Sequence, residues 1–375
     1  QFQVNTQTSD FQREPSVASL KDGGFVVTWQ DIGKSPDAIS GQRYDASGNP
    51  VGDEFQVSSN FSWDDGNDAD PISSVTGLDD GGFVVTWSGS NGAQGSGQRF
   101  DSSGTPVGDE FTINLNANNY SSDGQFAVAS LDDGGFVVTW RAYGEGENAP
   151  DGDLGGIFGQ RYDASGSPAG GEFQVNTHTD SYQNLPSVTA LNDGGFVVTW
   201  ESAAQDGDDY GIYGQRYDAS GAPNGGEFQV NSDTIGSQTR PSVTSLDGGG
   251  FVVTWHSSGS SEGIFGQRYD ASGAPVGGEF QINTHTDGVQ NEPSVTSLND
   301  GGFVVTWRSD DGDSNIHGQR YDASGTAVGD EFQVNTTDGY HAQSSVDSLG
   351  IVVDDAAAGI ITITEDQLLA NVTDV

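Results

Sequence analysis

Carboxylates recur in three segments at a spacing that suits a hard cation. The tripeptide Asp-Gly-Asp occurs at residues 151–153, 206–208 and 311–313. Alternating carboxylates around a glycine suit calcium, which takes oxygen ligands, although no Glu completes the spacing of an EF-hand loop. We therefore predict calcium at one or more of these segments, with a solvated acidic loop as the alternative. The predicted ligands are Asp151, Asp153, Asp206, Asp208, Asp310, Asp311 and Asp313.

Aromatic side chains beside carboxylates indicate a second kind of chemistry. A cluster of acidic residues follows Trp63, and tyrosines stand in other segments that read as loops. Such a set can bind a sugar by stacking and hydrogen bonding, directly or through calcium; equally, the rings can cap the core. The predicted ligand-binding residues are Trp63, Asp64, Asp65, Asp68, Tyr143 and Tyr210.

Four repeated strings must position these residues. Ser-Val-x-Ser-Leu in its commonest form occurs seven times, Gly-Phe-Val-Val-Thr-Trp six times, Gly-Gln-Arg-Tyr/Phe-Asp six times, and Phe-Gln-Val-Asn in its typical form seven times. Each string is short, rich in β-branched and aromatic residues, and bounded by Gly, Asp, Asn or Pro, as strands are. Four short strands in each unit of roughly 50 residues predict a β-propeller, ahead of a sandwich array or a solenoid.

The spacing between strings predicts two different faces. The Val of the first string lies 8 residues before the Phe of the second, and the Gly of the third lies 14 residues before the Phe of the fourth, in all six units. The other two joins vary, from 10 to 19 residues and from 14 to 20 residues. In an up-and-down blade the constant joins lie on one face, named here the fixed-turn face, and the variable joins on the other, the variable-loop face. Because binding usually sits on loops that a rigid scaffold positions, we place it on the variable-loop face.

The repeats also indicate how the ring closes. We favour seven blades, with six as the alternative, because the chain starts with a fourth string at Phe2 and ends with another first string around Val346. The last blade would take residues 345–349, 350–353 and 360–364, with the N-terminal strand completing it and removing an exposed edge. The propeller would then span residues 1–365, and residues 366–375 would be a linker or the start of a following domain.

Regular arginines and tryptophans have structural explanations. Six arginines occupy the same place in the third string, where an ion pair or a backbone bond to an acidic turn is expected. They are Arg43, Arg99, Arg161, Arg216, Arg268 and Arg320. The tryptophan that ends the second string is expected to pack between blades.

Composition narrows the function. The formal net charge of −43 disfavours nucleic acid as a partner through long-range repulsion, and no cysteine is present to form a disulfide. We find no nucleophile elbow, zinc motif or phosphate loop, and no single place where the repeat symmetry is broken as catalysis usually requires. The sequence therefore predicts that the protein is not an enzyme; a polysaccharide-degrading enzyme stands as one alternative and a structural spacer or protein-contact module as another.

The repeat resembles those of very large RTX-type surface or secreted proteins of Gram-negative, often marine, bacteria. The residues that carry this are Pro-Ser-Val-Thr-Ser-Leu-Asn-Asp-Gly-Gly-Phe-Val-Val-Thr-Trp and the later Gly-Gln-Arg-Tyr-Asp-Ala-Ser-Gly, and residues 361–375 resemble the opening strand of a cadherin-like domain. The resemblance implies a calcium-dependent adhesive module at the cell surface, within a larger chain exported by type I secretion. The nonapeptide calcium repeat itself is absent from this chain. We expect an extracellular module that binds a glycan, a polysaccharide or a surface protein, without inserting into a membrane.

Overall fold

The computed structural model describes most of the chain. The described residues are 2–6, 11–32, 38–58, 72–88, 95–113, 126–144, 151–310, 314–335, 344–346, 352–357 and 360–364. The predicted terminal segment, residues 366–375, lies outside them. Among the described residues no helix is long and apolar enough to cross a membrane.

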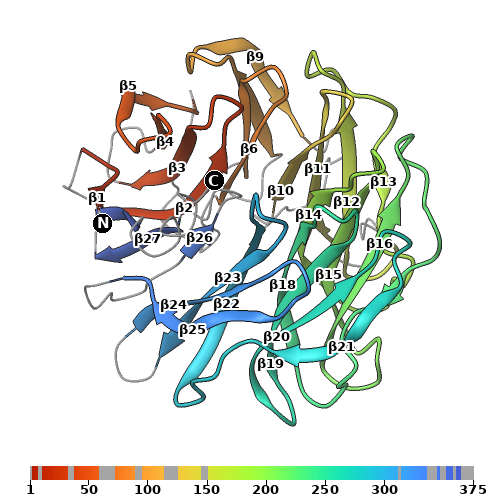
Figure 1. Ribbon diagram of the computed structural model, residues 1–375. Coiled ribbons are helices and arrows are strands. Elements are labelled where there is room, and N and C mark those ends of the chain that lie inside the picture. The colour runs from red at the N-terminus through yellow and green to blue at the C-terminus, as the bar shows by residue number, and fades with distance from the viewer. Residues whose placement is uncertain are drawn as a thin grey trace.

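The protein is an all-β propeller of four-stranded antiparallel blades arranged around a central channel (Figure 1). The prediction of this architecture is confirmed. Six blades each consist of four strands that follow one another in the chain, one blade for each complete repeat. A further four-stranded sheet has the order β1-β28-β27-β26, so the N-terminal strand pairs with strands near the C-terminus. This sheet fills the ring between the last and the first repeat, because β26 contacts both β22 and β2.

The first string of each repeat forms the innermost strand and the second string forms the next one. The innermost strands are β2 (Phe11–Ser19), β6 (Ser73–Gly77), β10 (Phe126–Ser130), β14 (Gln183–Ala190), β18 (Gln238–Ser245), β22 (Val289–Ser297) and β26 (Ser344–Val346). The second strands are β3 (Phe25–Ile32), β7 (Phe83–Trp87), β11 (Phe136–Tyr143), β15 (Phe196–Ala203), β19 (Phe251–Ser258), β23 (Phe303–Asp310) and β27 (Val352–Ala357).

The third and fourth strings form the outer half of each blade. The third strands are β4 (Ala38–Tyr44), β8 (Ser96–Phe100), β12 (Gly155–Tyr162), β16 (Tyr210–Tyr217), β20 (Glu262–Tyr269), β24 (Ser314–Tyr321) and β28 (Ile360–Thr364). The outermost strands are β5 (Pro50–Gln56), β9 (Pro106–Thr112), β13 (Phe173–Gln174), β17 (Phe228–Gln229), β21 (Pro275–Gln281), β25 (Ala327–Gln333) and β1 (Phe2–Gln3). In the terminal sheet, residues 347–351 of the predicted first and second strands lie outside the described residues.

The core lies between neighbouring blades, which explains why the second string is so uniform. Every residue from Phe196 to Trp200 is buried, because its alternate side chains enter the interfaces on both sides of the blade. Phe196 stacks on Tyr217 of the third strand, with ring centroids 4.6 Å apart. Trp200 is completely buried in the same cluster, as predicted for the repeated tryptophans.

Aspartates close the constant turns locally. In the turn after β10, Asp133 Oδ1 accepts a hydrogen bond from the backbone N–H of Gly135 at 2.9 Å, and Gly134 has a φ of 82°. In the turn after β12, Asp163 Oδ1 accepts hydrogen bonds from the backbone N–H groups of Ser165 and Ser167. A glycine is favoured where φ is positive because it has no Cβ to clash.

The third-string arginines join these turns, as predicted. Arg161 Nη2 lies 2.9 Å from Asp133 Oδ2 in its own blade, and its stem packs against Gly221 in the next blade. The fifth repeat has Gly248 where the others have this aspartate, and Arg268 instead donates to the carbonyl oxygens of Ala323 and Ser324 in the next blade. The two kinds of constant turn therefore meet on one face.

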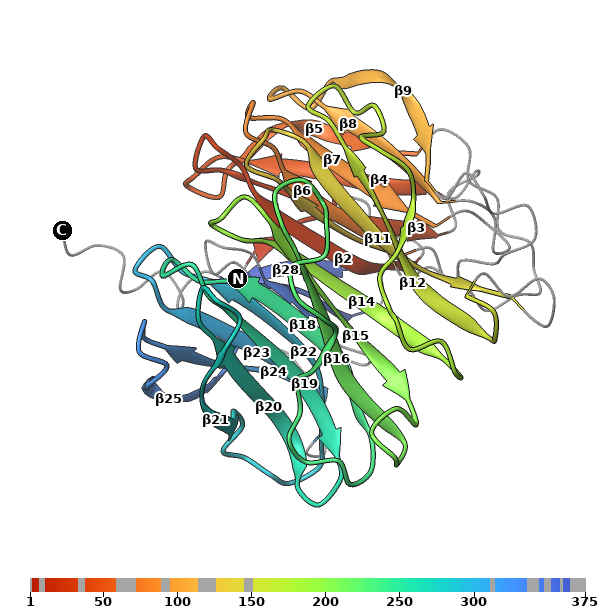
Figure 2. The same ribbon diagram turned by 90° about the vertical axis from the view of Figure 1, so that its right-hand side faces the viewer.

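The variable loops meet on the opposite face. Asp153, in the loop after β11, accepts a hydrogen bond from the backbone N–H of Ser181, in the loop before β14, at 2.6 Å. Asp208 accepts the equivalent bond from the backbone N–H of Gly236 at 2.8 Å. Seen from the side, the connections lie at opposite ends of the strands (Figure 2). The predicted separation of the two faces thus holds among the described residues.

Candidate functional site

The Asp-Gly-Asp segments connect loops on the variable-loop face. In two of them the first aspartate accepts a hydrogen bond from the backbone N–H of the second, from Asp153 to Asp151 at 3.2 Å and from Asp208 to Asp206 at 3.3 Å. The second aspartate holds the following inner-strand loop, as described above. These carboxylates therefore have a structural role that does not require a metal.

Calcium binding stays a prediction. Burial raises the pKa of Asp151, against the opposing effect of hydrogen bonds, and Asp310 pairs with Arg308 at 3.1 Å. Asp311 and Asp313 lie outside the described residues. Within the described ranges, no three or more His, Asp or Glu side chains converge as a metal site would require.

The aromatic candidates fall into two groups. Trp63, Asp64, Asp65 and Asp68 lie outside the described residues, so the structure does not place them. Tyr143 ends β11, and Tyr210 begins β16. Both lie at the variable-loop end of their strands, and both belong to the cluster described below.

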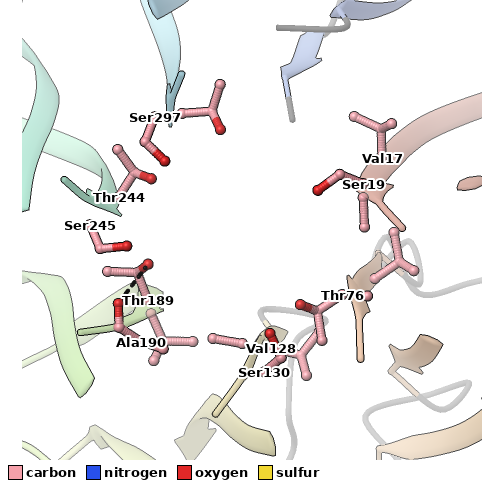
Figure 3. A pocket seen from close by; sticks show the side chains of 16 residues that line it. Val17, Ser19, Thr76, Val128, Ser130, Thr189, Ala190, Thr244, Ser245 and Ser297 are labelled. Atoms are coloured by element: carbon pink, nitrogen blue, oxygen red, sulfur yellow. Dashed lines mark hydrogen bonds between the residues drawn. The ribbon is translucent and has the colours of Figure 1, made fainter. Parts of the chain in front are cut away.

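The central channel provides a cavity of about 360 Å³ at the fixed-turn end. Its walls are the last residues of six inner strands, and Figure 3 shows small hydroxyl and aliphatic side chains around the opening, among them Ser19, Thr76 and Ser245. No lining residue is ionisable at neutral pH. The cavity can offer hydrogen bonds, but it holds no group for acid–base chemistry.

At the opposite end, four inner strands carry a bulge. The register with the second strand shifts between Asn184 and Ser187, and β2, β18 and β22 show the same irregularity. Each bulge contains a proline, and the residue before that proline has a left-handed backbone conformation. The four residues are Glu14, Leu185, Arg240 and Glu292, with φ between 51° and 58°. Bulges of this kind re-aim side chains, and left-handed residues other than glycine are costly and concentrate at functional sites.

Glu201 lies at the centre of the residues that the bulges bring together. Its side chain is buried, and its two oxygens accept hydrogen bonds from Asn184 Nδ2 and from the backbone N–H of Arg240, each at 3.1 Å. Burial raises the pKa of Glu201, and these hydrogen bonds oppose the rise. The carboxyl group is therefore shifted toward its protonated form.

Aromatic rings flank this carboxyl group. The Arg141 guanidinium carbon lies 5.2 Å from the ring centroid of Tyr143 and 5.7 Å from that of Tyr182, and the two rings are stacked 6.2 Å apart. Burial raises the pKa of Tyr210, as does the charge of Glu201, whereas a hydrogen bond with the Asn184 side chain lowers it. All three rings are half-buried.

The network continues into the next two blades. Arg240 Nη1 lies 3.3 Å from Glu292 Oε1, so it joins β18 to β22. His256 lies in the strand beside β18, and burial lowers its pKa, with the charge of Arg240 acting in the same direction. We name this set the bulge cluster. Its members are Arg141, Tyr143, Tyr182, Asn184, Glu201, Tyr210, Arg240, His256 and Glu292.

Three buried acceptor atoms at the bulges have no hydrogen-bond partner within the described structure. They are Asn184 Oδ1, Asn291 Oδ1 and Glu292 Oε2. A buried acceptor without a donor costs about 1–3 kcal/mol, so groups that could supply O–H or N–H donors are favoured here. Together with the tyrosine rings, the cluster can stack on an apolar face and accept several hydrogen bonds. Glu201 and Tyr210 are in addition candidates for proton transfer.

Sequence reasoning missed most of the cluster, although one signal was present. The residue after the repeated tryptophan differs in every unit except for one repeated arginine, whereas the preceding five residues are the same. These residues are Gln30, Ser88, Arg141, Glu201, His256 and Arg308. The repeat is therefore uniform up to the tryptophan and variable immediately after it.

Comparison with known proteins establishes the fold alone. No family model and no curated protein matches the chain. A polysaccharide lyase described as an ulvan lyase bound to -[GlcA(1-4)Rha3S]- is similar, with a TM-score of 0.60 and 12% identity over 97% of this chain and 96% of that one. The polysaccharide lyase Uly1 is also similar, with a TM-score of 0.57 and 9% identity over 98% and 99%. A protein of unknown function from Dyadobacter fermentans is similar as well, with a TM-score of 0.53 and 12% identity over 96% of this chain and 95% of that one.

These similarities correct the prediction that the protein is not an enzyme. Two of the proteins that match nearly the whole chain are polysaccharide lyases, so this architecture supports catalysis on carbohydrate in other proteins. The exclusion also depended on finding no single place that breaks the repeat symmetry, and it did not consider the variable position after the tryptophan. The local chemistry of the cluster must therefore decide between binding and turnover, because fold by itself does not specify function.

Proposed function

We propose that the protein recognises a carbohydrate at the bulge cluster, on the variable-loop face. The observation that carries this is that three half-buried tyrosine rings lie in one cluster with Asn184, whose Oδ1 has no hydrogen-bond partner, and that Arg240 links this cluster to the unpartnered Glu292 Oε2. Rings stack on the apolar faces of sugars, and sugar hydroxyls are donors for the acceptors. The carbohydrate-active proteins of similar fold support the proposal.

The bulge cluster differs from the site that the sequence predicted. Tyr143 and Tyr210 are retained, whereas the arginines, Asn184 and Glu201 replace loop carboxylates as the central polar groups. A role in adhesion, an extracellular location and membership of an RTX-type surface protein stay predictions. If the acidic loops also bind calcium, they would support the site through the contacts of Asp153 and Asp208 with the inner-strand loops.

A binding measurement tests this proposal. Tyr182→Ala removes a ring of the cluster, and we expect it to weaken the best ligand of a glycan array about tenfold, in line with about 1–2 kcal/mol for a ring contact. Ile235→Ala is the matched control, because Ile235 lies in the equivalent loop of the next blade and its side chain is 60% exposed. Loss of binding in both variants, or in neither, would contradict the site.

Cleavage of the bound carbohydrate is the second candidate, favoured by Glu201. A buried carboxyl with a raised pKa beside a tyrosine is the kind of pair that donates and accepts protons in sugar chemistry. Glu201→Gln keeps the side-chain shape but removes the titrating group. If the protein cleaves its ligand, this variant should bind it while releasing new chain ends at least about 100-fold more slowly. Equal rates in both proteins would exclude Glu201 from the reaction.

A further inference from the structure

We infer that the ligand of the bulge cluster is an uncharged, hydroxyl-rich sugar chain. The inference deepens the proposed carbohydrate function and rests on it. It concerns the class of ligand, which the lyase bound to a uronate and sulfated saccharide does not decide for this chain, because the likeness extends to the fold alone.

Three buried acceptors at the bulges lack a hydrogen-bond partner within the described structure. Asn184 and Asn291 occupy the same position in two inner strands, and Glu292 follows Asn291; Asn184 Oδ1, Asn291 Oδ1 and Glu292 Oε2 each need a donor. Sugar hydroxyls donate, whereas a carboxylate or sulfate group only accepts. An anionic group would add a further acceptor beside these three oxygens, whereas a sugar hydroxyl can supply the donor that each of them lacks.

The arginines at this end of the strands already have partners in the chain. Arg240 pairs with Glu292 at 3.3 Å, and Arg308 pairs with Asp310 at 3.1 Å. Arg141 lies against two tyrosine rings and is attracted by Glu201, while Arg13 donates to Gln30. Each of these four arginines thus already contacts a group of the chain, and Arg240 and Arg308 are paired with carboxylates.

The surroundings add long-range repulsion. The described loops beside the cluster carry Asp153, Asp180, Asp208, Asp209 and Asp233, and the chain as a whole has a net charge of −43. Concentrated charge of one sign repels a polyanion over about one Debye length, roughly 8 Å at physiological salt. An uncharged chain experiences no such repulsion.

Arg240 is the side chain through which a ligand would reach the buried acceptors. Its side chain is 46% exposed, whereas that of Glu292 is 17% exposed, and a single contact joins them. A ligand that displaces this arginine could place a sugar hydroxyl where it donates to Glu292 Oε2. The ion pair spans two blades, so both blades would contribute to one ligand.

A charge-matched glycan panel tests the inference. Oligosaccharides of equal length are compared in three classes, namely uncharged, carboxylated and sulfated, at 50 mM and 500 mM NaCl. We expect an uncharged member to bind best, with less than a twofold change in affinity between the two salt concentrations. Binding of only anionic members would overturn this inference and leave the proposed function standing. No binding in any class, with the protein folded, would overturn both.

A substitution sharpens the result. Glu292→Gln replaces an acceptor oxygen by an NH₂ donor, so an uncharged ligand should bind about tenfold more weakly, the loss of one hydrogen bond to a charged acceptor. An anionic ligand should instead bind more tightly to this variant. Thermal unfolding verifies that the variant is folded, and Ile235→Ala serves as the control that leaves affinity unchanged.

Discussion

The two faces of the propeller use aspartate in different ways. On the fixed-turn face, Asp163 accepts hydrogen bonds from its own turn, and those bonds lower its pKa. On the variable-loop face, Asp153 and Asp208 bond to a different loop. Contacts within one turn can be repeated unchanged in every blade, whereas a contact between two loops depends on the lengths of both loops. This difference explains why one face is uniform and the other can carry a site.

The glycines of the two faces should differ most in stability. A Cβ on Gly135 would lie 2.2 Å from the carbonyl oxygen of Tyr162, whereas nothing lies within 4 Å of a Cβ on Gly207. We expect Gly135→Ala to lower the free energy of unfolding by about 4 kcal/mol, and Gly207→Ala by about 1–2 kcal/mol for its left-handed φ of 98°. Urea unfolding measures both, and equal losses would contradict the comparison.

Two glutamates should respond to pH in opposite directions. Burial alone raises the pKa of Glu331, but hydrogen bonds from His317, Thr284 and His285 outweigh it and lower the pKa to about 2. Glu331 thus stabilises the fold above its unfolded pKa, near 4.5, and this contribution is lost as pH falls toward 2. The pKa of Glu201 is raised, so its contribution to stability decreases as pH rises above 4.5.

Two variants test these opposite pH dependences of stability. Glu331→Gln should lower the melting temperature at pH 7 and flatten its fall between pH 5 and pH 2. Glu201→Gln should raise the melting temperature at pH 7 and leave it nearly unchanged at pH 3, as expected where a site residue is strained for function. Scanning calorimetry at the two pH values measures both, and a lower melting temperature for Glu201→Gln at pH 7 would contradict the account of the cluster.

The arginine pairs should give a smaller effect. Arg161→Ala removes a contact with Asp133 at 2.9 Å and the packing of the arginine stem on Gly221. We expect a loss of about 1 kcal/mol, because Asp133 is 55% exposed. Lys21→Ala is the control, since Lys21 and Asp79 are both more than 60% exposed. A larger loss for Lys21→Ala would contradict the interpretation of the arginines as structural.

Calcium should give the smallest effect. If the predicted sites bind it, a chelator should lower the melting temperature by a few degrees, in line with about 1 kcal/mol of linked binding energy. Asp151→Asn should abolish the response when Asp151 is a ligand. A melting temperature that is independent of chelator in the unsubstituted protein would contradict the calcium prediction.

The sequence predicted the fold well because the relevant interactions are local and repeated. The segment from Phe196 to Trp200 predicts a buried strand. In the preceding blade, Asp163 and Gly166 predict the turn that follows the third strand. The distances between such segments predicted the two faces. The pairing of the N-terminal strand β1 with β28 was likewise predicted from the surplus strings at the two ends of the chain.

The site could be predicted only in part. Tyr143 and Tyr210 were selected because the sequence places them between the repeated strings. Glu201 directly follows the second string and Asn184 precedes the first, so both read as ordinary strand residues. Their meeting depends on two bulges: the one before Pro186 shifts the register at Asn184, and the one before Pro241 contains Arg240, whose backbone N–H donates to Glu201. Pattern and spacing give no access to that shift. A comparison of the six residues that follow the repeated tryptophans would have shown the variation.

Hydrogen exchange in the presence of a bound oligosaccharide tests the central claim most directly. The account predicts slower exchange in residues 182–185, 201–210 and 236–241, and unchanged exchange in the fixed turns at residues 163–166 and 218–221. Protection confined to the fixed turns or to the channel end near Ser245 would contradict it.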